Sequence, residues 1–234
     1  KTFMVINEET KRNMNRMGFT NCQQEGDPLF DNALLIASND YRNQIIEQFC
    51  ETASEVFVGG SINDINDLNI ITGFANRQPK LKFIIAPHEI SKESLHRIQA
   101  HLEGRSLLYS DCTADTDFTS VQTIIIDYIG DLSRIYRYGR YAYVGGGFTP
   151  FLHSVIEPVA YGLPISFGPN IYRKATPHQM IDRGFAAIVT TDRELEQWYC
   201  NTRGTAYDDM HAAALRYAKE NGGSTQSIVK TILG

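Results

Sequence analysis

Short apolar runs recur along the chain, and longer amphipathic stretches separate them. The runs predict strands at residues 3–6, 56–59, 83–86, 107–109, 123–126, 142–145, 165–167 and 187–189. Several runs are apolar at successive positions, which is typical of strands buried on both faces. The amphipathic stretches predict helices over residues 8–17, 41–52, 63–76, 92–102, 154–161, 176–183, 192–199 and 206–220, with a last helical turn at 228–233.

This alternation of strands and helices predicts an α/β fold with a doubly wound, mostly parallel sheet. In such sheets the ligand binds beyond the carboxyl ends of the strands. A polar segment at residues 23–31, with Gly26 and Pro28, interrupts the alternation near the start of the chain. We therefore expect residues 1–26 to be the tail of a preceding domain with its linker, and residues 27–234 to form one ligand-binding α/β domain.

The composition excludes several classes of protein. The chain has 234 residues, of which 42% are hydrophobic and 21% charged, and these values exclude a disordered chain. Its 22 basic and 27 acidic residues leave a net charge of −5. We expect no nucleic acid partner, because phosphate binding needs clustered Lys and Arg. No apolar run approaches the ~20 residues that span a bilayer. The four cysteines lie far apart without Cys-x-x-Cys spacing, so we expect free thiols and no zinc site.

Most of the candidate chemistry lies between residues 125 and 170. Glycines 145–147 follow a predicted strand, and they would let backbone N–H groups approach a ligand closely. The helix expected to begin near Ser154 would offer N–H donors to a phosphate. Glu157 in its first turn would accept hydrogen bonds from a ribose diol. The spacing Ser154-x-x-Glu157 is also that of a capping box, in which both side chains only satisfy the helix start. Spacing alone leaves both interpretations open and favours the capping box.

A longer series of motifs resembles the C-terminal domain of bacterial 3-deoxy-D-manno-octulosonic acid (Kdo) transferases. That family reads approximately GEL, LY, FVGGS, GGHNPLEPA, G-x-P and FGP. The resemblance covers nearly the whole chain, at Asn7-Glu8, Gly18, Gly26-Asp27, Phe30-Asp31, residues 57–61 (FVGGS), 85–88 (IAPH), 129–132 (IGDL), Tyr136, 144–146 (VGG), His153, 157–158 (EP), 162–164 (GLP) and 167–169 (FGP).

The resemblance implies the nucleotide-sugar domain of a GT-B glycosyltransferase, a two-domain fold in which the acceptor domain comes first. The family transfers Kdo from CMP-Kdo to a lipid A precursor at the cytoplasmic face of the Gram-negative inner membrane. It therefore implies CMP-Kdo as the donor, with no metal and no cofactor. The lipid A precursor, the membrane surface and the catalytic base would all be met by a missing domain, so this chain alone is expected to be inactive.

The resemblance also implies which residues contact the donor. Nucleotide contacts are expected from Pro87, His88, Ile129, Gly130, Asp131, Ser154, Val155, Ile156 and Glu157, and sugar or phosphate contacts from Ser61, Gly146, Gly147 and His153.

Two departures from the family pattern keep other functions open. His88-Glu89 stands where the family has Arg-His, so an expected phosphate-binding Arg is absent, and Ser154 stands where the family has Asn. The alternatives are another GT-B enzyme, such as a UDP-sugar transferase or epimerase, and a non-catalytic module that binds a sugar or nucleotide. Separately, residues 134, 137 and 140 are arginines, and their spacing predicts a basic stripe on one helix face.

Overall fold

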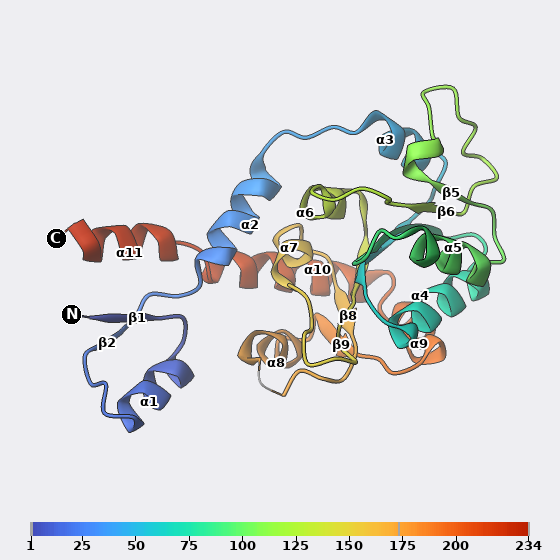
Figure 1. Ribbon diagram of the computed structural model, residues 1–234. Coiled ribbons are helices and arrows are strands. Elements are labelled where there is room, and N and C mark those ends of the chain that lie inside the picture. Colours follow the sequence, from blue (N-terminus) through green and yellow to red (C-terminus); the bar gives the residue numbers. More distant parts are fainter. Residues whose placement is uncertain (1, 173, 234) are drawn as a thin grey trace.

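A seven-stranded, all-parallel sheet forms the centre of the computed structural model, which describes residues 2–172 and 174–233 (Figure 1). The strand order is β5-β6-β4-β3-β7-β8-β9. The predicted doubly wound α/β fold is thus confirmed. The strands are β3 (Val56–Ile62), β4 (Lys82–Pro87), β5 (Ser106–Leu108), β6 (Thr123–Ile125), β7 (Tyr141–Val144), β8 (Ile165–Phe167) and β9 (Ala186–Ile188).

Helices cover both faces of this sheet, because successive side chains of each strand point to opposite faces. On β3, Val58 faces one apolar cluster and Phe57 the other. The Val58 face is covered by α2 (Pro28–Ser38), α3 (Gln44–Glu51), α6 (Leu132–Ile135), α7 (Ile156–Ala160), α8 (Ala175–Asp182) and α10 (Thr205–Glu220). The Phe57 face is covered by α4 (Ile65–Arg77), α5 (Lys92–His101) and α9 (Asp192–Asn201).

The first part of the chain forms a separate βαβ unit. Strands β1 (Phe3–Val5) and β2 (Cys22–Gln24) pair in parallel, and α1 (Glu8–Arg16) connects them. Figure 1 shows this unit beside α11 (Ser224–Leu233), away from the large sheet. The buried carboxylate of Glu25 accepts hydrogen bonds from the hydroxyls of Ser227 and Thr231 on α11. The last helix therefore ties the first unit to the rest of the chain, and the division into residues 1–26 and 27–234 stays a prediction.

Among the elements that were not predicted, β2 and α2 lie at the polar segment of residues 23–31. Strand β2 has only three residues and no apolar run. Helix α2 begins at Pro28, and Asp27 caps it by accepting a hydrogen bond from Leu29 N at 3.0 Å. An Asp N-cap followed by Pro in the first helical position is a helix-start signal. The polar segment at residues 23–31 therefore does not simply interrupt the alternation, because Asp27 and Pro28 mark the start of a helix within it.

The strand order reverses between β3 and β7. From β3 the chain continues to β4, then to β5 at the edge of the sheet and back to β6, and it crosses to the other side of β3 with β7, β8 and β9. At such a switch point the two connections leave in opposite directions, and a crevice opens beyond the carboxyl ends of the two strands. The fold thus places the ends of β3 and β7 where a ligand site is expected.

The Asp31 side chain on α2 holds the start of α11. It accepts hydrogen bonds from the backbone N–H groups of Gly223 and, at 2.6 Å, of Thr225. Burial alone would raise the pKa of Asp31, but these hydrogen bonds outweigh it and lower the pKa. We expect Asp31→Ala to lower the free energy of unfolding by about 0.5–2 kcal/mol at pH 7, as for the loss of a helix cap.

The pH dependence follows from the sign of that shift. A carboxyl group with a lowered folded-state pKa stabilises the fold above its unfolded pKa of about 3.9, and this contribution is lost as the pH falls through the folded pKa. The difference between parent and variant in urea unfolding should therefore shrink below about pH 4. Asp40→Ala, at an exposed position just after α2, is the control. Equal unfolding midpoints for the two variants at pH 7 would contradict the role of Asp31.

Candidate functional site

Glycines allow the ends of β3 and β7 to pack against each other. A Cβ atom on Gly145 would lie 2.1 Å from the carbonyl oxygen of Ser61, and one on Gly60 would lie 2.0 Å from the Tyr136 hydroxyl. Ser61 itself has a φ of 55°, in the left-handed region, next to a break in the β3–β4 register. Strained backbone of this kind in a non-glycine residue concentrates at functional sites.

A buried carboxylate on α4 accepts hydrogen bonds from residues at the ends of β3 and β7. Asp67 on α4 is fully buried and accepts hydrogen bonds from Tyr143 Oη at 2.6 Å, Gly146 N at 2.7 Å and Asn63 N at 3.2 Å. Burial raises the pKa of Asp67, and the three donors oppose that effect. The sequence analysis missed Asp67, although an acidic residue among the apolar positions of a helix is a recognisable signal.

The glycine run does not act in the way expected from the sequence. The Gly145 N–H donates to Gly60 O at 2.9 Å, and the Gly146 N–H donates to Asp67. Both donors are therefore occupied, and neither is available to a ligand. A Cβ atom on Gly147 would lie 2.4 Å from Gly168 N at the end of β8. Gly145 and Gly147 thus serve close packing of the strand ends. Of the three N–H groups, that of Gly147 donates to no protein acceptor in the described residues and is the one left for a ligand.

A cavity of about 210 Å³ lies beyond these strand ends and contains Glu157. It is lined by Ser61, Leu132, Ser133, Tyr136, His153, Ser154 and Glu157. The predicted residues Ser61, His153, Ser154 and Glu157 are thus brought together, and Leu132, Ser133 and Tyr136 join them. The cavity has the position of a ligand site at the switch point.

The Glu157 carboxylate has no partner within the described part of the chain. No protein group there donates a hydrogen bond to it, and no Lys, Arg or His nitrogen lies within 4.0 Å. Burial, with a smaller contribution from the Glu157 charge, raises the pKa of Tyr136 in the same cavity. A half-buried acceptor without a protein donor is suited to a ligand that brings donors of its own.

The capping box considered for residues 154–157 is wrong. Helix α7 begins at Ile156 with Val155 at the N-cap, and no side chain caps it. The reason is Pro158. If Ser154 were the N-cap, Pro158 would occupy the first position whose N–H is needed for a helical hydrogen bond, and proline has none. Starting one residue later places Pro158 where no N–H is required. In the described residues the N–H groups of Ser154 and Val155 have no protein acceptor.

Val155 and Ile156 enter the site only through their backbone. Their side chains are buried in the apolar cluster on the Val58 face of the sheet. A ligand in the cavity would therefore meet the side chains of Ser154 and Glu157, and the intervening main chain.

Two histidines lie against each other at the entrance to the cavity. Pro87 ends β4, and the exposed His88 ring that follows packs on His153 with ring centroids 4.3 Å apart. The His153 Nε2 atom is buried without a hydrogen-bond partner. Burial lowers the pKa of His153, and the nearby His88 and Lys174 lower it further. Lys174, which the sequence analysis missed, therefore lies close enough to His153 to act on its charge.

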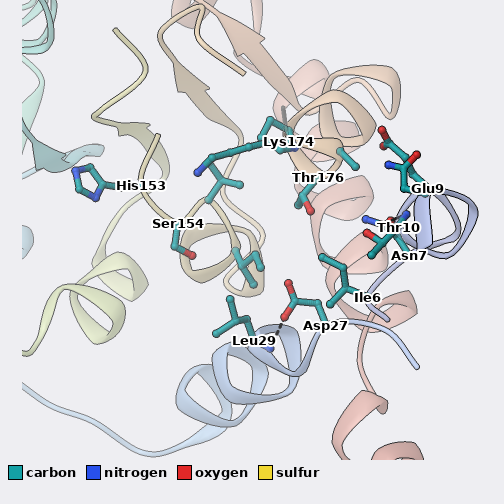
Figure 2. Close-up of a pocket in the computed structure, with 15 residues that line it drawn as sticks. Ile6, Asn7, Glu9, Thr10, Asp27, Leu29, His153, Ser154, Lys174 and Thr176 are labelled. Carbon is teal, nitrogen blue, oxygen red and sulfur yellow. Dashed lines mark hydrogen bonds between the residues drawn. The ribbon is translucent and has the colours of Figure 1, made fainter. Parts of the chain in front are cut away.

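A larger cavity of about 530 Å³ continues from His153 and Ser154 toward the N-terminal unit. Figure 2 shows residues of α1 and the start of α2 facing Ser154, Lys174 and Thr176 across it. Because His153 and Ser154 line both cavities, the two spaces adjoin. A bound molecule could therefore extend from Glu157 to the wall formed by α1.

The loop at residues 129–131 lies between β6 and α6. Ile129 is 84% exposed, and Gly130 has a φ of 120°, so this turn requires glycine. The Asp131 carboxylate accepts hydrogen bonds from Tyr41 Oη at 3.1 Å and Arg134 Nη1 at 2.9 Å. Its side chain is therefore engaged within the protein, and the loop presents main-chain groups and the Ile129 side chain.

The predicted basic stripe does not exist. Helix α6 ends at Ile135, so the three arginines do not share a helix. Arg134 pairs with Asp131, Arg137 donates to backbone oxygens of Asn39 and Tyr41, and Arg140 pairs with Glu55 at 3.2 Å. Across residues 2–172 and 174–233, no helix is long and apolar enough to cross a membrane, and no cluster of three or more His, Cys, Asp or Glu residues could hold a metal ion.

The mostly parallel sheet with helices on both faces defines a class of fold, that of the Rossmann-like domains of GT-B glycosyltransferases. The C-terminal CMP-Kdo binding domain of WaaA from Acinetobacter baumannii has this fold, with a TM-score of 0.62 and 19% identity over 79% of this chain and 97% of that one. HepE from Anabaena in complex with UDP-glucose also has it, with a TM-score of 0.61 and 11% identity over 99% of this chain and 63% of that one.

The similarity in sequence is narrower than the similarity in fold. No family model matches the chain. A 3-deoxy-D-manno-octulosonic acid transferase of Chlamydophila psittaci is 31% identical over 93 residues, which are 39% of this chain and 21% of that enzyme. The aligned part thus spans about one fifth of that relative. The resemblance of this chain to Kdo transferases is confirmed.

Removing the charge of Asp67 tests whether it holds the strand ends. In Asp67→Asn an amide NH₂ replaces one of two accepting oxygens, so at least one buried donor loses its acceptor. We expect the free energy of unfolding to fall by about 1–3 kcal/mol in urea titration. The matched control is Asp64→Asn, because Asp64 caps α4 through Asn66 N and Asp67 N and Asn caps as well as Asp. A control that unfolds as easily as Asp67→Asn would contradict this role.

Proposed function

We propose that this chain is the donor-binding domain of a Kdo transferase and binds CMP-Kdo at the switch point. The observation that carries the proposal is the Glu157 carboxylate, which is half-buried in the 210 Å³ cavity and has no partner among residues 2–172 and 174–233. A ribose diol would donate two hydrogen bonds to it. The sequence similarity to Kdo transferases supports this nucleotide sugar over others.

The rest of the donor extends along the two cavities in this proposal. Main-chain groups of the loop at residues 129–131 receive the cytosine, next to the ribose at Glu157. The unpaired N–H groups of Ser154 and Val155, with His88, hold the phosphate. The sugar then lies in the 530 Å³ cavity, toward the wall formed by α1.

The transfer would be an inverting displacement at the anomeric carbon. An acceptor hydroxyl oxygen forms a bond to this carbon while the bond from the carbon to the phosphate oxygen breaks, and CMP leaves with the electron pair. The hydroxyl proton passes to a base on an acceptor domain. The donor domain contributes fixed N–H dipoles and partly buried cations that stabilise the charge on the departing phosphate.

The remaining parts of the proposal concern the whole enzyme. A lipid A precursor as the acceptor and a site of action at the inner membrane follow from the kinship with Kdo transferases. We also propose that these 234 residues alone do not transfer sugar, because positioning two substrates needs both walls of the cleft.

Comparing nucleotides distinguishes this function from that of a UDP-sugar enzyme. We expect CMP to bind about tenfold more tightly than UMP in calorimetric titration, since one additional hydrogen bond to the base is worth about 1.4 kcal/mol. Tighter binding of UMP would favour the UDP-sugar alternative, for which HepE with UDP-glucose offers the same fold. Binding of neither nucleotide would favour a non-catalytic module.

Glu157→Gln tests the ribose contact directly. Gln keeps the shape of the side chain but loses the charge and one acceptor, so CMP affinity should fall roughly 10- to 150-fold, or about 1.5–3 kcal/mol. Because no protein group depends on this carboxylate, the melting temperature should stay close to that of the parent. Glu93→Gln, on the exposed first turn of α5, is the matched control and should bind CMP like the parent. Parental CMP affinity in Glu157→Gln would remove Glu157 from the site.

A further inference from the structure

Lys174 is a partly buried cation without a carboxylate partner. In the described chain its ammonium group donates to the carbonyl oxygen of Leu152, and no Asp or Glu oxygen lies within 4.0 Å of it. Burial lowers the pKa of Lys174, which means that its surroundings destabilise the charged ammonium form relative to water. An anionic ligand would offset this destabilisation.

His153 adds a second unsatisfied group beside it. Its Nε2 atom is buried and has no partner, and the proximity of Lys174 and His88 lowers its pKa, after burial. The negative charge of a ligand would oppose this lowering of the His153 pKa, and the ligand would supply the missing hydrogen-bond partner of Nε2. The two side chains come from separate segments, and both line the larger cavity.

The lining of the two cavities distinguishes Lys174 from the nucleotide subsite. His153 lines both cavities, whereas Lys174 lines only the larger one and Glu157 only the smaller one. Within the proposed function, the order from ribose to phosphate to sugar therefore places Lys174 at the sugar. A ulosonic acid carries its carboxylate on the anomeric carbon, which also bears the phosphate oxygen, so its two anionic groups are neighbours.

We propose that Lys174, with His153, forms the subsite that binds the carboxylate of the donor's acidic sugar. The inference rests on the proposed function. The opposite wall of the cavity supports this orientation, since it carries the carboxylates of Glu9 and Asp27 and the amides of Asn7 and Asn13. These groups would repel a carboxylate and accept from sugar hydroxyls, which turns the acid toward Lys174.

The test compares two ligands that differ by the sugar acid. CMP and freshly prepared CMP-Kdo are titrated calorimetrically into the parent chain, Lys174→Met, Lys174→Arg and the control Lys80→Met, which replaces an exposed lysine far from both cavities. We expect Lys174→Met to weaken CMP-Kdo roughly 10- to 150-fold, the range for a charge-assisted hydrogen bond, while CMP affinity changes less than about twofold. Lys174→Arg should restore most of the CMP-Kdo affinity.

Each other outcome overturns the inference in a recognisable way. An equal loss for both ligands would place Lys174 at the phosphate, or give it only a structural role through Leu152. Unchanged CMP-Kdo affinity in Lys174→Met would remove Lys174 from the site. A parent chain that binds neither ligand would refute the proposed function, and the carboxylate subsite with it. A parent chain that binds both but shows no split in Lys174→Met would leave the proposed function intact and refute only this subsite.

Discussion

The close contact between the carboxyl ends of β3 and β7 is the constraint on which the rest of the structure depends. Gly145 lets the two strand ends meet, Gly60 leaves room for the Tyr136 hydroxyl, and the Asp67 carboxylate on the neighbouring helix accepts the N–H of Gly146. A buried polar donor without an acceptor costs about as much as a lost hydrogen bond. The crevice lies beyond these strand ends because the strand order reverses between β3 and β7, so the two following connections leave in opposite directions.

Around the crevice, unsatisfied groups are distributed unevenly. In the described residues, the Glu157 carboxylate in the smaller cavity accepts no hydrogen bond from the protein. Beside it, the N–H groups of Ser154 and Val155 have no protein acceptor. The cation without an anion, Lys174, lies in the larger cavity. Natural proteins seldom leave buried polar groups unpaired, so such a succession along one continuous space describes the ligand in outline: donors first, then negative charge.

The N-terminal βαβ unit completes the larger cavity and gives it a second wall of different chemistry. That wall bears carboxylates and amides, and it lies opposite Lys174 and His153. Its position depends on α11, which contacts Glu25 at the end of β2 and Asp31 on α2. The two ends of the chain, more than 200 residues apart in sequence, thus jointly place one side of the site.

The alternation of apolar runs and amphipathic stretches was enough to predict the fold class and most of the elements, because hydrophobic periodicity is a local property of the chain. The motifs around residues 145–170 were enough to predict which segment carries the site. The sequence could not reveal which groups would be left unpaired, since that depends on neighbours brought from distant segments. Gly146 looked like a free donor until Asp67, 79 positions away, proved to be its acceptor.

The predicted capping box shows that spacing alone can also suggest a contact that does not form. Ser154 and Glu157 have the right spacing, but Pro158 moves the helix start by one residue, and Glu157 then faces a cavity without a partner. The proline was present in the sequence, so the helix start was determined locally. That Lys174 and His153 lie together was decided only by the tertiary structure, because side chains from two loops meet only once the parallel strands between them have paired.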